Sequence, residues 1–178
     1  MQSIKLETDD IRQLAGGIWG TMFSLELGEG KSEQLHDGRS FLTGCIQLSG
    51  AWDGAVVFHC SEKLANALAM KMFGTEELSN SDLCDAVGEL TNLLSGAMQS
   101  LVPAPSELTP PSVVEGKEHK LVMPRCKPIC ETAFECMGEP FTVIVFDANS
   151  PDAHESALKN GQKGSLLKRP SHPTQCDE

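Results

Sequence analysis

Long hydrophobic runs are absent from this sequence. The longest, AVVF at residues 55–58 and FTVIVF at residues 141–146, are far too short to cross a bilayer. The N-terminal stretch MQSIKLETDDIRQ also lacks the apolar segment that follows the basic start of a secretory signal peptide. The expected location is therefore the cytoplasm.

Positive charge is also scarce. Fourteen Lys and Arg residues stand against 25 Asp and Glu residues, which gives a formal net charge of −11 over 178 residues. Nucleic-acid backbones and anionic membrane surfaces both attract clustered basic side chains. The composition therefore argues against nucleic acid and against a membrane as partners.

The cysteines lack the number and spacing of a disulfide or zinc framework. All seven are scattered through apolar sequence, so we expect reduced thiols that mostly pack as small core residues. His119, Cys126, Cys130 and Cys136 are close together, and the three cysteines would share one face of an unbroken strand. Because no C-x₂-C pair accompanies them, buried thiols are favoured over a metal site, which stays as the alternative.

Common catalytic motifs are missing as well. The sequence contains no G-x-S-x-G, H-E-x-x-H or Walker A pattern, and GEGK at residues 28–31 is too short for the last. The five histidines are isolated from one another in the sequence. None of these patterns therefore indicates a catalytic site.

The chain has the composition of one globular domain, with 40% hydrophobic and 22% charged residues. We assign residues 1–149 to this domain. Residues 150–178 are rich in Pro, Gly, Ser and Lys and show no core pattern, so they are expected to form a flexible tail.

Helices are predicted from apolar residues that recur at helical spacing. The first begins near Thr8 or Asp9, either of which can cap it. A short second helix lies between Ser61, a capping residue, and Gly74, which ends it. A long third helix is predicted from about Asp82 to Val102.

Two β-rich hairpins complete the expected fold. Residues 41–48 and 55–60 flank the turn SGAWDG, and a second pair of β-rich runs in residues 119–148 is separated by GEP. The fold class that follows is α+β or mixed α/β, with an antiparallel-rich sheet packed against helices.

One side of the long helix carries an unusual set of polar residues. At 100° per residue, four residues lie within about 40° of Asp85 on the side opposite the apolar stripe: Glu89, Asn92, Gly96 and Gln99. A solvated helix face is the default interpretation of such a pattern. However, no Lys or Arg lies between Ser81 and Val102 to balance the two carboxylates. The face therefore favours a partner that supplies a cation.

The segment DAVGELTNLLSG resembles the signature of the CheC/CheX family of chemotaxis phosphatases. Asp85, then Glu89 after three intervening residues, then Asn92 after two more, match the family pattern in type and spacing. Pro111 in LTPPSVVEG matches the family's downstream proline, with a slightly shorter gap. The single copy of the motif makes the chain similar to CheX rather than to the two-motif CheC.

The resemblance implies a function and a partner. The chain would be a protein phosphatase that accelerates hydrolysis of the aspartyl phosphate on a CheY-like response regulator, with water as the nucleophile. Glu89 and Asn92 would act in catalysis, and Asp85, Gly96, Gln99 and Pro111 would contact the partner. The chain itself would bind no cofactor, since Mg²⁺ belongs to the regulator. A homodimer joined through sheet edges is also implied.

The alternative is a binding module without activity. Flagellar motor switch proteins resemble this family without needing the Glu and Asn pair, so a chain of this fold can bind a regulator and leave its phosphate intact. The presence of Asp85, Glu89 and Asn92 together favours the enzyme.

Overall fold

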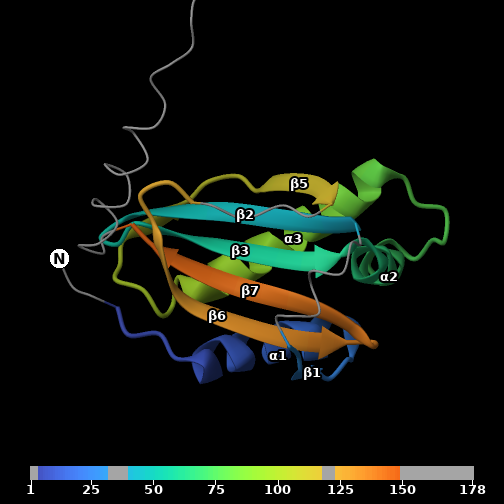
Figure 1. The fold of residues 1–178 in the computed structure, drawn as a ribbon, viewed down its shortest axis with the longest axis horizontal. Helices are drawn as coiled ribbons and strands as arrows, with labels where there is room; N and C mark the ends of the chain where they lie inside the picture. The colour runs from blue at the N-terminus through green and yellow to red at the C-terminus, as the bar shows by residue number, and fades with distance from the viewer. Residues whose placement is uncertain (1–3, 32–39, 118–122, 149–178) are drawn as a thin grey trace, which may run out of the picture.

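The computed structural model describes residues 4–31, 40–117 and 123–148 of the 178-residue chain. The proposed tail at residues 150–178 lies outside these ranges. Within these ranges, three helices and seven strands follow one another (Figure 1): α1 Thr8–Phe23, β1 Gly28–Glu29, β2 Ser40–Gly50, β3 Gly54–Ser61, α2 Glu62–Phe73, α3 Asn80–Met98, β4 Ser106–Leu108, β5 Ser112–Lys117, β6 Lys127–Cys136 and β7 Glu139–Asp147.

The strands form one seven-stranded sheet with antiparallel pairing throughout. Its order is β1-β6-β7-β3-β2-β4, and β5 also pairs with β2. The long strand β2 has two partners on the same edge, because residues 40–45 pair with β5 and residues 48–50 pair with β4. Together with the helices, this sheet confirms the predicted α+β class.

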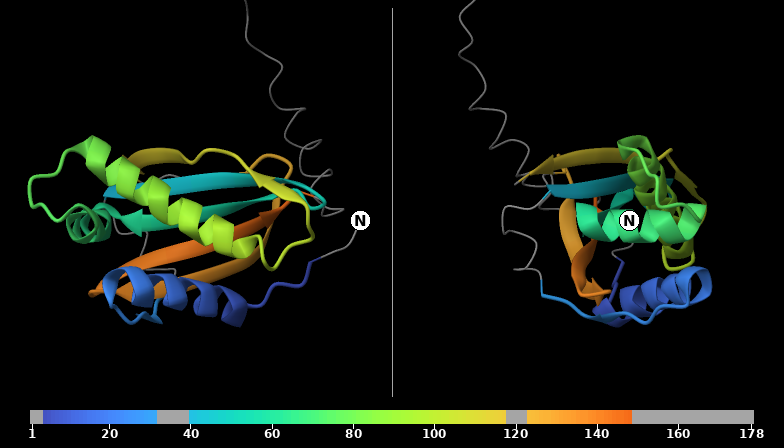
Figure 2. Two further views of the ribbon diagram at one scale, coloured as in Figure 1. Left: turned by 180° about the vertical axis from the view of Figure 1, so that it is seen from behind. Right: turned by 90° about the vertical axis from the view of Figure 1, so that its right-hand side faces the viewer.

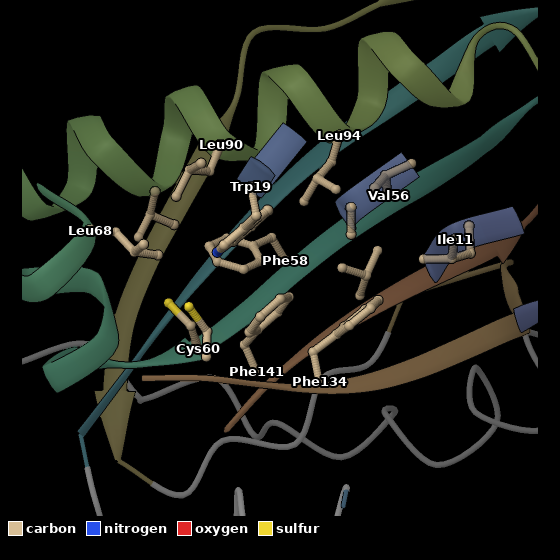
Figure 3. Close-up of a cluster of buried hydrophobic side chains, with 14 of the residues drawn as sticks. Ile11, Trp19, Val56, Phe58, Cys60, Leu68, Leu90, Leu94, Phe134 and Phe141 are labelled. Atoms are coloured by element: carbon tan, nitrogen blue, oxygen red, sulfur yellow. The ribbon is translucent and has the colours of Figure 1, made fainter. Parts of the chain in front are cut away.

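All three helices cover the same face of the sheet, and α3 crosses the strands diagonally (Figure 2). The main core lies between these two layers (Figure 3). Trp19 of α1 stacks on Phe141 of β7 at a ring-centroid distance of 4.9 Å, and Phe134 stacks on the same ring at 4.8 Å. Leu90 and Leu94 of α3 are fully buried in this core. Their burial fixes which side of α3 faces away from the sheet.

The first hairpin and the second helix have the predicted form. β2 and β3 pair antiparallel on either side of the predicted turn. The Ser61 side chain accepts a hydrogen bond from the Leu64 amide at 3.1 Å, and Gly74 ends the helix with a left-handed φ of 67°. The start of α1 differs slightly: Glu7 is the capping residue, and its amide donates to the Asp10 carboxylate at 2.9 Å.

The long helix is shorter at its C-terminus than predicted. α3 begins at Asn80 because Ser79 and Asp82 form a reciprocal capping box, and it ends at Met98 rather than Val102. The Ser100 and Leu101 amides donate to the Ala97 and Met98 carbonyls in tighter i→i+3 turns, which close the helix. Gln99 is therefore a capping residue and not part of the helical face.

The prediction that Cys126, Cys130 and Cys136 share one strand face is wrong. Cys126 lies before β6, and a register shift between Pro128 and Cys130 interrupts the regular alternation. Cys130 and Cys136 enter the main core, whereas Cys126 packs with a smaller cluster of Ala55, Val57 and Phe146 on the other face of the sheet.

The second hairpin exists, but its turn and extent differ from the prediction. β6 begins at Lys127, and Met137 and Gly138 form the turn with φ of 54° and 76°, so Glu139 and Pro140 already belong to β7. Strands β1, β4 and β5 were not predicted. They are short. In β5 the exposed and buried residues do not alternate regularly, because only Val113 and Gly116 are half-buried and the other four residues are exposed.

Candidate functional site

The polar face of α3 points away from the core, as the helical spacing predicted. Asp85 and Glu89 are exposed and Asn92 is half-buried, while Leu83, Leu90 and Leu94 on the other side are buried. Glu89 and Asn92 lie one turn apart on the same side of the helix. An approaching protein can therefore reach both side chains.

Strand β5 and the residues before it form a wall beside this face. A hollow of about 450 Å³ lies between α3 and this wall. Seven residues line it: Cys84, Asp85, Gly88, Glu89, Asn92, Pro111 and Val113. Four residues predicted from the sequence motif, Asp85, Glu89, Asn92 and Pro111, thus meet at one place although Pro111 is far from the others in sequence.

Gly96 and Gln99 do not line this hollow. Gly96 is exposed one turn beyond Asn92, and a side-chain carbon at that position would meet no atom within 4 Å. The Gln99 side chain is half-buried, and its Nε2 donates to the Ser106 carbonyl at 2.9 Å. Gln99 therefore connects the end of α3 to β4, and its contact with a partner stays a prediction.

The structure adds residues that the sequence interpretation missed. Cys84 and Gly88 on α3 and Val113 on β5 complete the lining. Glu115 of β5 lies nearby and accepts a hydrogen bond from Asn80 Nδ2 at 3.0 Å. Gly88 stands inside the motif, between Asp85 and Glu89, so its position was a usable signal. Val113 and Glu115 could not be placed, because β5 was not recognised as a strand.

Negative charge dominates the electrostatics of the hollow. Its lining contains two carboxylates, one amide and no basic residue. Loss of solvent raises the pKa of the Cys84 thiol, and the Glu115 and Asp85 carboxylates raise it further. Since the thiolate is the reactive form of cysteine, Cys84 is kept in the unreactive form at neutral pH. The site can accept cations and orient a water molecule, but its lining provides no activated nucleophile.

A second, larger hollow lies elsewhere, and its polar residues have a structural role. It measures about 710 Å³ and lies at the start of α2, next to the buried Glu139 carboxylate. Ser61 Oγ donates to Glu139 at 3.0 Å, and Lys63 Nζ forms an ion pair with it at 2.5 Å. These bonds satisfy the buried charge and join α2 to β7.

Metal ligands and membrane spans are both missing from the described residues. Over residues 4–31, 40–117 and 123–148, no three His, Cys, Asp or Glu side chains are grouped so as to hold a metal ion. His119, part of the alternative metal set, lies outside these ranges. No helix in the same ranges is long and apolar enough to cross a membrane.

Comparisons with known proteins agree on a family. The family model described as chemotaxis phosphatase CheX matches residues 42–135. The crystal structure of CheX from Vibrio vulnificus is similar with a TM-score of 0.67 and 23% identity, and the match covers 82% of this chain and 100% of that chain. No curated protein sequence matches this chain.

Two further structures share the fold at lower identity. One is the CheX–CheY–BeF₃–Mg²⁺ complex from Borrelia burgdorferi, with a TM-score of 0.60, 15% identity and coverage of 80% of this chain and 97% of that chain. The other is FliY from Thermotoga maritima, with a TM-score of 0.52, 17% identity and coverage of 86% and 90%.

The family match spans the part of the chain that builds the hollow. Residues 42–135 include α3 with Glu89 and Asn92, Pro111, and the whole of β5. Because this match covers more than half of the 178 residues, the chain belongs to the CheX family of chemotaxis phosphatases.

Proposed function

We propose that this chain accelerates hydrolysis of the aspartyl phosphate on a CheY-like response regulator. The observation that carries the proposal is the arrangement of Glu89 and Asn92. Both can be reached from solvent, both line one hollow on α3, and no activated nucleophile accompanies them in the lining. The chain would supply an oriented water and not a covalent intermediate.

The chemistry of an acyl phosphate suits such a site. Water attacks the phosphorus in line, the bond between phosphorus and the aspartyl oxygen breaks, and the products are inorganic phosphate and a free carboxylate. Phosphoryl transfer depends mostly on positioning and charge neutralisation. The regulator carries Mg²⁺ and a lysine around its own phosphoryl group, so this chain needs neither.

Asn92 has the side chain to hold the attacking water. A carboxamide can donate one hydrogen bond and accept another without adding charge that repels phosphate. Asn92 is half-buried in the hollow, so its side chain loses less freedom on docking than a fully exposed amide would. A glutamine orients water in a similar way in some GTPases.

Glu89 and Asp85 fit a docking role. Glu89 is exposed one turn from Asn92, and a lysine of the regulator would form a charge-assisted hydrogen bond with it. Asp85 and Pro111 extend the contact on the two sides of the hollow. The structural neighbour from Borrelia burgdorferi is a CheX bound to CheY, which supports this class of partner for the present chain. Such a partner would place the reaction in the cytoplasm.

Acyl-phosphate decay tests the proposal directly. A purified CheY-like receiver is phosphorylated with a small-molecule phosphodonor, and loss of its phosphate is followed with and without this chain. The chain should accelerate decay in the presence of Mg²⁺, and EDTA should remove the acceleration because the receiver's Mg²⁺ is lost. Unchanged decay with a receiver that binds the chain would refute the proposal.

The second candidate is a binding module without activity. The similarity to FliY favours it, because that fold match does not depend on an active Glu and Asn pair. The same assay separates the two functions. A binding module would co-purify with the receiver yet leave the phosphate signal unchanged.

We also propose that the chain forms a homodimer through a sheet edge. Among the described residues, β5 pairs only with β2, so its other edge is open to a second copy. Val114 of β5 is 59% exposed, which adds an apolar side chain next to that edge. Sedimentation at several concentrations tests this, and a monomer at all of them would contradict it.

A further inference from the structure

Gly44 of β2 lies directly beneath α3 and has no room for a side chain. A Cβ atom built there would lie 2.0 Å from Thr91 Oγ1, 3.1 Å from Thr91 Cβ and 3.2 Å from Val87 Cγ1. Thr91 and Val87 are fully buried. The first distance is far below van der Waals contact, so any residue other than glycine would force Thr91 to turn away or α3 and β2 to move apart.

Thr91 cannot turn away from Gly44 without cost. Its hydroxyl donates to the Val87 carbonyl at 2.6 Å, and this bond is buried within α3. A different rotamer would leave the hydroxyl without this partner in an apolar core. The depth of α3 on the sheet is therefore set where the Thr91 side chain meets the Gly44 backbone.

Gly44 is also connected to the opposite wall of the hollow. Its partner across the β2–β5 ladder is Val113, which lines the hollow. On the helix side, Gly88 faces the same wall, because a Cβ there would meet Pro111 Cγ at 3.5 Å and Val113 Cγ2 at 3.7 Å. Thr91 immediately precedes Asn92. Gly44 therefore contacts α3 on one side of the hollow and pairs with β5 on the other.

We propose that Gly44 is a positioning residue for the hollow. Because Gly44 has no side chain, Thr91 can pack directly against the β2 backbone. This contact sets the distance between α3 and the sheet, and so the distance between Asn92 and the wall formed by Pro111 and Val113. This inference rests on the proposed phosphatase function for its kinetic consequence, but its geometric part stands independently. Gly44 touches neither water nor phosphate and acts through the placement of Asn92.

A pair of substitutions tests the inference by steric rescue. Gly44→Ala should fold but lower the decay rate at saturating chain concentration by about tenfold or more, since a shift near 1 Å in a reacting group can cost about a hundredfold. Thr91→Ala removes the atom at 2.0 Å. The double variant Gly44→Ala/Thr91→Ala should therefore recover most of the lost rate.

Two further measurements separate positioning from simple loss of stability. The Asn92 side-chain amide and Val113 methyl resonances should shift in Gly44→Ala and return in the double variant. Gly17→Ala is the matched control, because Gly17 is exposed on α1 and a Cβ there meets nothing within 4 Å. This control should keep the wild-type rate and resonances.

The outcomes distinguish the two proposals. Wild-type rate and unshifted resonances in Gly44→Ala would overturn the inference, and so would a double variant that stays slow or unfolded. If Gly44→Ala alone fails to fold, recovery of a folded, active double variant still supports the steric pairing. If the wild-type chain accelerates no decay, the phosphatase proposal fails, while the resonances still test the geometry.

Discussion

Glu89 and Asn92 lie one turn apart, but solvent reaches them to different degrees. Glu89 is exposed on the polar face of α3, so an ion pair between its carboxylate and a lysine of the partner is weak until the partner excludes water. Asn92 is half-buried beside β5, where neighbouring residues limit its motion. This contrast fits a division of roles in which Glu89 recognises the partner and Asn92 orients the water.

Replacing Glu89 should affect binding more than the maximal rate. Glu89→Gln removes one charge-assisted hydrogen bond, worth about 1.5–3 kcal/mol, so the half-saturating chain concentration should rise about tenfold or more. The concentration dependence of receiver decay measures this. Glu107→Gln, an exposed carboxylate on β4 outside the hollow, is the control and should change little.

The sequence motif identified the residues of the hollow better than the helical wheel did. Asp85, Glu89 and Asn92 are on the helical face and in the motif, Pro111 comes from the motif alone, and all four line the hollow. Gln99 and Gly96 came from the helical face alone. Gly96 is within α3 but lies outside the hollow, and α3 ends at Met98, before Gln99. The end of a helix depends on its final carbonyls and on the loop that follows, which a periodic pattern does not contain.

At the scale of elements, a capping box of Ser79 and Asp82 fixes the N-terminus of α3, the helix that carries Asp85, Glu89 and Asn92. The Ser79 side chain and amide donate to Asp82 at 2.6 and 2.7 Å, and these bonds lower the pKa of the Asp82 carboxyl below its ordinary 3.8. A carboxyl with a lowered folded-state pKa stabilises the fold above its ordinary pKa. That contribution is lost as the pH falls through the folded-state value.

Asp82→Asn should therefore remove a pH-dependent contribution to stability. The free energy of unfolding should be higher for the wild type than for the variant above pH 3.8, and the difference should shrink at lower pH. Urea denaturation across this range measures the difference. A gap that stays constant with pH would show that the Asp82 charge does not stabilise α3.

The contact between α3 and β5 predicts a graded response at Gly88. A Cβ there meets Pro111 Cγ at 3.5 Å, an ordinary contact, so Gly88→Ala fits and should stabilise the helix by up to about 1 kcal/mol. Gly88→Leu has no such space and should displace the wall of the hollow, lowering both stability and the decay rate. Equal destabilisation by both variants, measured by thermal unfolding, would contradict this packing.

The strength of local signals explains which elements could be predicted. Strands β2 and β3 have long apolar patterns, helix α2 has an apolar pattern with clear capping residues at both ends, and all three were predicted. Strands β4 and β5 are short edge strands whose residues are mostly exposed or half-buried, so they show no apolar alternation. Their pairing with β2 depends on tertiary contact, as does the register shift in β6 that separates Cys126 from Cys130.

At the scale of the whole molecule, the described core is continuous from α1 to β7. The main cluster of buried side chains runs from Ile11 to Val145 and includes all three helices. Truncation after residue 149 should therefore leave the thermal unfolding midpoint and the decay rate unchanged. A clear loss of either in the truncated chain would show that residues 150–178 belong to the folded unit.

The charge of the whole molecule also shapes association. With a formal net charge of −11 and a hollow lined by carboxylates without a basic residue, the chain should attract a partner surface rich in lysine or arginine. Association should therefore weaken as salt rises, since added ions screen exposed charges beyond about 10 Å at 0.1 M.

Comparing wild type with Asn92→Ala at saturating concentration tests the central claim most directly. Binding to a receiver loaded with BeF₃⁻ and Mg²⁺ first establishes that the variant still forms the complex. The account predicts that phosphate loss in the Asn92→Ala complex falls to the receiver's own rate, a drop of about a hundredfold or more if the wild type positions the water fully. Decay at the wild-type rate in that complex would contradict the account.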